Sequence, residues 1–243
     1  MTAYPAWLAA LSWAYLGVAF LSALIILADE FRRPQKMFIM NLVWPITALY
    51  WGPVALWGYL RTGRRMTKHH ERQQSGGQHQ QHVREQSGHG QREPPTRSQV
   101  AVAATHCGAG CTLGDIAGEF WVAAMALRFA GGEFETRLVM DFMLAWSFGV
   151  IFQYFSIVPM RGLSPGKGIV TAMRADTLSI IAFQVGLFGW MALVYYVLFT
   201  EPHLRPGEAV FWFMMQIGMI IGFFTSYPVN VFLLKRGWKE KMG

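Results

Sequence analysis

The stretch THCGAGCTLGD (residues 105–115) lies inside an otherwise apolar run from Ala101 to Leu127. A run of this length can cross a bilayer as a helix, which needs about 20 apolar residues. The stretch contains both cysteines of the protein, one of its seven histidines and a run of glycines. It therefore predicts a transmembrane helix that carries polar chemistry within the membrane.

This predicted helix has two distinct stripes, because residues four apart share one face of a helix. The first is a seam of small residues, which lets a neighbouring membrane helix approach closely; it consists of Gly110, Gly114 and Gly118. The second is offset by one residue, or about 100°, and consists of Cys107, Cys111, Asp115 and Glu119. We expect the first stripe to pack against another helix and the second to face protein interior.

Composition places the whole chain among membrane proteins. Of its 243 residues, 53% are hydrophobic and 14% are charged, whereas about 25% of the residues of a soluble domain are charged. The apolar runs lack the alternation of transmembrane strands, which excludes a barrel. The sequence predicts an all-α, polytopic membrane helix bundle with six transmembrane helices, at about 6–28, 37–60, 101–127, 138–158, 169–199 and 208–234. Pro45 and Pro53 are expected to kink the second of them.

A polar segment divides this bundle in two. Residues 61–100 are rich in glutamine and histidine and hold almost no apolar residue, so they cannot bury enough surface to offset the entropy of ordering. We expect a two-helix N-terminal membrane hairpin (1–60), a disordered His/Gln-rich cytoplasmic linker (61–100) and a four-helix membrane module (101–243). Histidine-rich tracts can bind metal; a solvated linker with inert histidines is the alternative.

The distribution of lysine and arginine orients the predicted helices. With six crossings, both termini and the 61–100 segment share one side, which holds 15 of the 21 basic residues. By the positive-inside rule that side is cytoplasmic, although the cluster of Arg32, Arg33 and Lys36 falls on the other side. The net charge of +7 therefore reflects membrane topology. We expect the lipid bilayer as partner, a homo-oligomer or partner membrane protein as further options, and no nucleic acid.

His106, Cys107 and Cys111 form a candidate site for a soft metal ion. Thiolate and thioether ligands select Cu(I) over hard cations, and two thiols one helical turn apart, beside an imidazole, could hold one ion. This favours copper as the cofactor. Two alternatives stay open: the cysteines are small buried residues that pack beside the glycines, or the thiols and carboxylates take part in redox chemistry with a quinone or haem.

Asp115 and Glu119 continue the stripe of Cys107 and Cys111 along the same predicted helix. Together with Asp141 of the next predicted helix they form a predicted polar track. A carboxylate near the centre of a membrane costs several kcal/mol and is by default a functional-site hypothesis. Depth estimates place a supporting cluster in the cytoplasmic half of the helices, made up of Gln153, Tyr154, Arg174, Asp176 and Asn230. Gly218 and Gly222 form a second small-residue pair for helix packing.

The stretch 105–115, together with Thr-Ser-Tyr-Pro-Val-Asn at 225–230 and the basic tail up to residue 241, resembles a bacterial multi-pass membrane family catalogued as a domain of unknown function. Some members of that family carry a copper-oxidase label. The resemblance covers roughly residues 101–241 and implies a bacterial cytoplasmic (inner) membrane protein. The sequence lacks the histidine-rich ligand motifs of multicopper oxidases, so oxidase activity is not expected.

The sequence thus predicts an integral inner-membrane protein that binds or translocates a soft metal ion, with Cu(I) the first candidate. A structural or interaction protein with inert cysteines is one alternative, and a membrane oxidoreductase subunit is the other. Motifs of metalloproteases, serine hydrolases and nucleotide-driven pumps are missing from the sequence, so an enzyme is not favoured.

Overall fold

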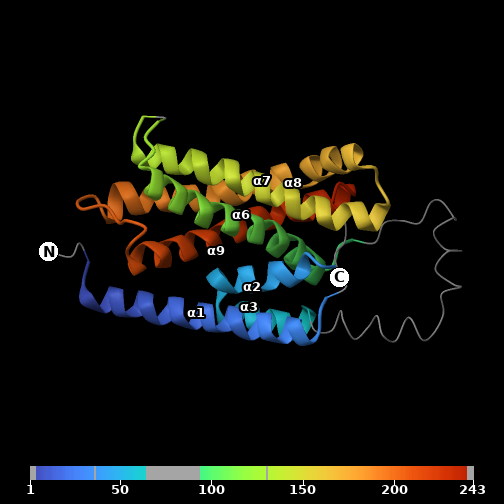
Figure 1. Ribbon diagram of the computed structural model, residues 1–243, viewed down its shortest axis with the longest axis horizontal. Coiled ribbons are helices and arrows are strands. Elements are labelled where there is room, and N and C mark those ends of the chain that lie inside the picture. The colour runs from blue at the N-terminus through green and yellow to red at the C-terminus, as the bar shows by residue number, and fades with distance from the viewer. Residues whose placement is uncertain (1–3, 36, 64–93, 130, 240–243) are drawn as a thin grey trace, which may run out of the picture.

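The computed structural model describes residues 4–35, 37–63, 94–129 and 131–239 (Figure 1). Within these ranges the chain folds into helices without strands, which confirms the predicted all-α bundle. The elements are α1 (Ala6–Arg32), α2 (Met40–Trp51), α3 (Pro53–Gly58), the π-helix η1 (Tyr59–Gly63), α6 (Arg97–Met125), α7 (Glu133–Arg161), α8 (Pro165–Leu193), the π-helix η2 (Val194–Leu198) and α9 (Ala209–Arg236).

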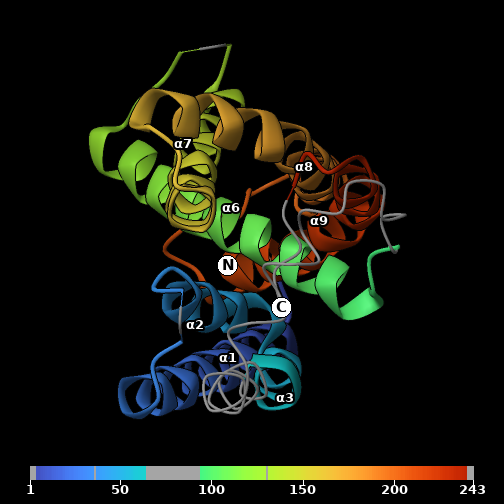
Figure 2. The ribbon, with the colours of Figure 1, turned by 90° about the vertical axis from the view of Figure 1, so that its right-hand side faces the viewer.

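The predicted number of six apolar spans is wrong. Among the described helices four are long and apolar enough to cross a membrane: α1, α7, α8 with η2, and α9. Helix α6 has 29 residues and is long enough, but its small and polar residues lower its hydropathy. It contacts α2, α7, α8 and α9 and lies in the middle of the bundle (Figure 2). A helix shielded by protein on so many sides does not need an apolar surface.

Residues 37–63 form a re-entrant helical hairpin beside α1 rather than one continuous helix (Figure 1). At the tip of this hairpin, Gly52 has a φ of +53°, which favours glycine and turns the chain from α2 into α3. A Cβ on Gly52 would lie 3.7 Å from the Cα of Ala19, in the middle of α1. At the base, the Gln35 side chain donates a hydrogen bond of 3.4 Å to the Gly63 carbonyl. The hairpin therefore enters and leaves at the same end of the bundle.

The tip of the re-entrant hairpin keeps its backbone satisfied by contacts with its neighbours. A helix that ends inside a membrane leaves carbonyl groups without helical partners, and each must find another donor. The last carbonyls of α2 accept hydrogen bonds from one backbone amide and two side chains: Gly52 N–H to Ala48 at 2.9 Å, Gln216 Nε2 to Leu49 at 2.5 Å and Tyr15 Oη to Tyr50 at 3.2 Å. Helices α9 and α1 thus hold the tip in place.

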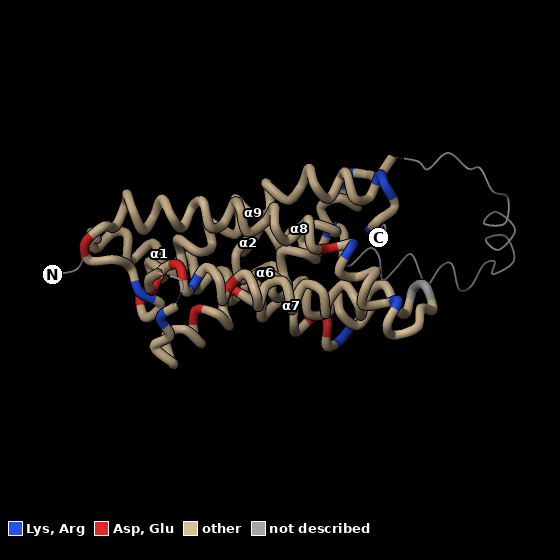
Figure 3. Tube along the Cα trace, turned by 90° about the horizontal axis from the view of Figure 1, so that it is seen from above, with Lys and Arg blue, Asp and Glu red and all other residues tan. Residues whose placement is uncertain are grey.

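Because the hairpin does not cross, α1 begins at one end of the bundle and α9 ends at the other (Figure 1). The expectation that both termini are cytoplasmic stays a prediction. Arg32 and Arg33 now lie at the same end as the base of the hairpin, whereas Lys36 lies outside the described residues. At the opposite end, Arg128 follows α6, Arg137 is near the start of α7 and Arg205 precedes α9. Figure 3 shows basic residues toward both ends of the bundle. Arginines of the described residues thus lie at both ends of the bundle.

Most of the predicted linker, residues 64–93, lies outside the described residues. Its last part is helical, because α6 begins at Arg97 instead of Ala101. Thr96 and Gln99 form a capping box, in which Thr96 Oγ1 accepts from the Gln99 amide at 3.3 Å and Gln99 Oε1 accepts from the Thr96 amide at 3.1 Å. Such a reciprocal pair satisfies two amides that have no helical acceptor.

Glycines on α6 allow this helix to pack closely against α7. A Cβ on Gly110 would lie 2.7 Å from the Cα of Gly149, and a Cβ on Gly114 would overlap the backbone of Ala145. Gly118, one turn further, lies directly under the carboxyl group of Asp141. Helices α8 and α9 meet in a similar way, since a Cβ on Gly222 would lie 2.7 Å from the Phe183 carbonyl oxygen and one on Gly218 would lie 2.5 Å from Leu187 Cδ1.

Candidate functional site

The polar stripe of α6 faces the interior of the bundle along its whole length. Cys107, Cys111 and Asp115 are fully buried, and Glu119 is 3% exposed. Burial follows from the glycine seam, because close contact with α7 leaves the neighbouring stripe enclosed between α7, α8 and α9. The structure therefore removes these side chains from lipid and places them among protein groups.

Asp115 occupies the centre of the stripe and is held by α8. Its Oδ1 accepts a hydrogen bond of 2.7 Å from Gln184 Nε2. Its Oδ2 is buried and has no hydrogen-bond partner among the described residues. The hydrogen-bond partner of this carboxyl group is thus a neutral amide, which supplies no compensating charge.

Glu119 and Asp141 form a pair of acids one turn beyond Asp115. Asp141 is 2% exposed and lies over Gly118, where a Cβ would collide with its Oδ1. The carboxyl group of Glu119 has a cation as partner, whereas Asp141 Oδ1 has no hydrogen-bond partner in the described part of the chain.

Arg137 on α7 supplies the positive charge in contact with these acids. Its Nη1 lies 2.9 Å from Glu119 Oε2, and its Nη2 lies 2.7 Å from Glu133 Oε1. One guanidinium is therefore shared between two carboxylates. Sequence analysis did not identify Arg137, although a basic residue one turn away from Asp141 on a membrane helix is a signal that could have found it.

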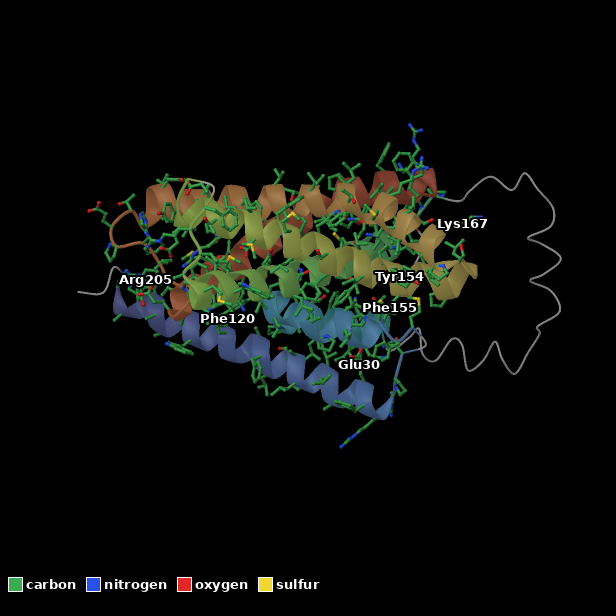
Figure 4. The ribbon with its side chains drawn as sticks, turned by 45° about the horizontal axis from the view of Figure 1, so that its top comes forward. Glu30, Phe120, Tyr154, Phe155, Lys167 and Arg205 are labelled. Carbon is green, nitrogen blue, oxygen red and sulfur yellow. The ribbon has the colours of Figure 1, made fainter. Side chains whose placement is uncertain are left out.

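A cavity of about 290 Å³ opens beside this group. Glu119, Asp141 and Arg137 line one wall, together with Glu133. The other walls are apolar or aromatic and include Phe134, Phe188, Met191, Tyr195 and Phe211, while the loop after η2 contributes Pro202, His203, Leu204 and Arg205. Arg205 marks the end of the bundle where α9 begins, and Lys167 marks the opposite end (Figure 4). The cavity thus connects the buried acids with one end of the molecule.

A second cavity of about 230 Å³ lies at the tip of the re-entrant hairpin. It is lined by residues of α1, α2, α6 and α9, including Leu49, Thr112, Gln216 and Met219. Met215 lines both cavities, so its side chain stands between the acid-lined space and the centre of the bundle.

At the other end, a buried ammonium group joins three helices. Gly237, with a φ of +68°, ends α9 and turns the chain back, so that Lys239 points into the bundle and is 2% exposed. Its Nζ donates hydrogen bonds to Asp176 Oδ1 at 2.6 Å, Asn230 Oδ1 at 3.0 Å and the Ala103 carbonyl at 3.2 Å. This network contains two predicted members of the supporting cluster, Asp176 and Asn230. It also contains Lys239, which the sequence did not reveal because nothing in it shows that the tail folds back.

The other predicted members of the supporting cluster do not join this network. Gln153 is buried, and its side-chain amide has no hydrogen-bond partner among the described residues. Arg174 lies over the ring of Trp238, 4.7 Å from its centre. The ring of Tyr154 packs edge-on against Phe155 at 5.5 Å (Figure 4).

The three predicted metal ligands do not form one group. Cys107 and Cys111 lie one helical turn apart on α6, and both are fully buried. The imidazole of His106 points toward α7, with Nε2 3.4 Å from Ser156 Oγ and its ring 6.2 Å from that of Phe152. No set of three or more His, Cys, Asp or Glu side chains in the described ranges is arranged to hold a metal ion. His106 directly precedes Cys107 in sequence, so its side chain leaves the helix about 100° away from that of Cys107, which explains the separation.

Residues 96–239 match the model of a family described as a domain of unknown function (DUF4396). The chain belongs to this family. The DUF4396 match spans α6 to α9 and ends at Lys239, so it includes the buried acids, Arg137 and the ammonium network, whereas α1 and the re-entrant hairpin precede it. No curated protein and no solved structure matches the chain.

Proposed function

We propose that this protein moves protons across the bacterial cytoplasmic membrane, with Asp115, Glu119 and Asp141 as the groups that hold them. The observation that carries the proposal is the excess of buried carboxyl groups over buried cations around α6. Arg137 is the cation in contact with Glu119, and it is shared with Glu133.

The cost of burying charge explains why protons are the expected cargo. An ionised carboxyl group without a partner in a low-dielectric interior is strongly unfavourable, and such a group takes up a proton instead. Asp115 has only a neutral amide partner, and Asp141 Oδ1 has no hydrogen-bond partner among the described residues. Groups with this property, arranged along a membrane helix, are typical of proton relays in pumps and transporters.

The re-entrant hairpin supports a transport function. Irregular backbone at membrane depth is tolerated where it is buried in protein or lines a cavity, and interrupted helices with ends near the midplane mark binding sites in many transporters. Here the tip at Gly52 lies beside the middle of α1, and Leu49 lines the second cavity together with Thr112 of α6.

The basic end of the bundle defines the proposed orientation. By the positive-inside rule, the end with Arg32, Arg33 and the start of α6 is cytoplasmic. The acid-lined cavity then opens toward the outer side, where α9 begins. A proton would reach Glu119 from outside and Asp115 after it.

Proteoliposomes that contain the full chain and a trapped pH-sensitive dye test this proposal. After a pH step, with the membrane potential clamped by potassium and valinomycin, we expect faster internal pH change than in protein-free vesicles. Glu119→Gln and Asp115→Asn should each reduce the rate at least tenfold. Glu135→Gln is the matched control, since Glu135 is on α7 but bonds Tyr196 outside the cavity. Equal rates for wild-type and protein-free vesicles would exclude proton movement by this protein.

A soft metal ion at the thiols is a second candidate function, favoured by one observation. Cys107 and Cys111 are fully buried one helical turn apart on α6, and thiolates select Cu(I). His106 does not fit as a third ligand in this arrangement. Metal analysis of the purified protein and of the Cys107→Ser/Cys111→Ser variant separates the two proposals: copper in the wild type alone supports a thiol site, and equal metal content in both removes it.

A further inference from the structure

We infer that the acid-lined cavity binds a small organic ammonium ion that carries an apolar or aromatic group. This inference rests on the proposed function, because it names a cation that enters the same site from which protons leave.

The charged groups that line the cavity include one more carboxyl group than guanidinium groups. Glu119, Glu133 and Asp141 contribute three carboxyl groups, while Arg137 and Arg205 contribute two guanidinium groups. Arg137 is engaged with Glu119 and Glu133, so Asp141 is the acid that no cation contacts among the described residues. With all of these groups ionised, one positive charge placed beside Asp141 makes the cavity neutral.

Asp141 has the geometry of a recognition group. It is 2% exposed, lines the cavity, and its Oδ1 has no hydrogen-bond partner within the described ranges. A buried acceptor without a donor destabilises the folded protein. An ammonium group, which has only donors to offer, removes this cost and supplies the missing charge.

The aromatic walls of the cavity favour a ligand whose ammonium group is attached to an apolar or aromatic group. Phe134 stacks on Tyr195 with ring centres 4.4 Å apart, and Tyr195 stacks on His203 at 3.7 Å. These rings, together with Phe188 and Phe211, form an aromatic wall along the cavity. Aromatic faces attract cations and also bury apolar groups. A cavity of about 290 Å³ is close to the lower limit of ligand pockets, which favours an amine with a single ring over a larger molecule.

Binding of 2-phenylethylammonium to the full chain in nanodiscs tests the inference, with 2-phenylethanol as the neutral isostere and empty nanodiscs as the blank. We expect wild-type protein to bind the ammonium at least tenfold more tightly than the alcohol in titration calorimetry. Asp141→Asn should reduce ammonium affinity at least tenfold and leave the weak alcohol affinity unchanged. Glu135→Gln, outside the cavity, should bind both as the wild type does.

Equal affinity for the ammonium and the alcohol in the wild type would overturn the inference without any variant, so a folding defect in Asp141→Asn cannot obscure the result. Unchanged ammonium affinity in a folded Asp141→Asn variant would overturn it as well. If the ammonium ion does not bind, the proton assay of Glu119→Gln and Asp115→Asn is unaffected, and only the inferred ligand class is wrong. Tight ammonium binding without any proton movement would instead reject the transport proposal and keep the binding site.

Discussion

Replacement of Lys239 by methionine tests the network that joins α6, α8 and α9. The substitution keeps most of the apolar stem and removes the ammonium group. That group donates hydrogen bonds to Asp176, Asn230 and the Ala103 carbonyl at 2.6, 3.0 and 3.2 Å. All three ammonium protons are therefore used, and all three acceptors lose a donor.

The expected magnitude follows from the burial of both charges. The side chains of Lys239 and Asp176 are each 0% exposed, and removal of one partner from a buried ion pair costs about 3–5 kcal/mol because the other charge is left uncompensated. For a chain of this size about 1 kcal/mol corresponds to roughly 2–4 °C in Tm. We expect Lys239→Met to lower the Tm by about 10 °C.

Thermal unfolding of the detergent-purified protein, followed by tryptophan fluorescence, measures this change. Lys235→Met is the matched control, since Lys235 is in the last turn of α9 and is exposed; its Tm should shift by no more than about 2 °C, as expected for a surface substitution. The double variant Asp176→Asn/Lys239→Met should recover part of the loss, because it leaves no buried charge. If Lys239→Met and Lys235→Met unfold at the same temperature, the ammonium network does not stabilise the bundle.

Two further predictions concern α6. Gly114→Ala places a Cβ against the Ala145 backbone and should lower stability by about 1–3 kcal/mol or more through overpacking. Gly189→Ala is the control, because its added Cβ meets nothing within 4 Å and should leave the Tm unchanged or slightly raised. An equal loss of stability in both variants would contradict close packing of α6 against α7 at Gly114. Cys107 and Cys111 are 0% exposed, so a membrane-permeant maleimide should label neither thiol in the folded protein and both after denaturation, as mass spectrometry would show; rapid labelling of the folded protein would refute their burial.

The general architecture could be predicted from the sequence, because long apolar runs leave few alternatives to membrane helices. The small-residue pattern at Gly110, Gly114 and Gly118 also suggested a packing face, and the structure places this seam against α7. Asp115 and Glu119 were identified as candidates because a carboxyl group in an apolar run is costly and therefore conspicuous.

The course of residues 37–63 could not be predicted from hydropathy alone. A hairpin of two short helices and one longer helix have the same apolar composition, and only the backbone at Gly52, followed by Pro53, distinguishes them. Pro45, which was expected to kink the chain, remains within α2. The hairpin and the low hydropathy of α6 together account for the difference between the six predicted spans and the four long apolar helices among the described residues.

Contacts between side chains of different helices could not be predicted from the sequence either. Helical spacing relates Cys107 to Cys111, because both are on one helix, but it does not show where His106 points relative to α7. The pairing of Asp176 with Lys239 depends on a reversal of the chain after α9. The predicted copper site failed to gather three ligands for the same reason, since its geometry depended on the rotation of separate side chains.

The position of Lys239 in the chain also bears on biosynthesis. Ribosomes make the polypeptide from its N-terminus, so α6 and α8 enter the bilayer while the residue that neutralises Asp176 has not yet been translated. Until the segment beyond Gly237 emerges and docks, the newly made bundle contains an acid that lacks its counter-ion. The core around Asp176 is therefore complete only once Lys239 has docked.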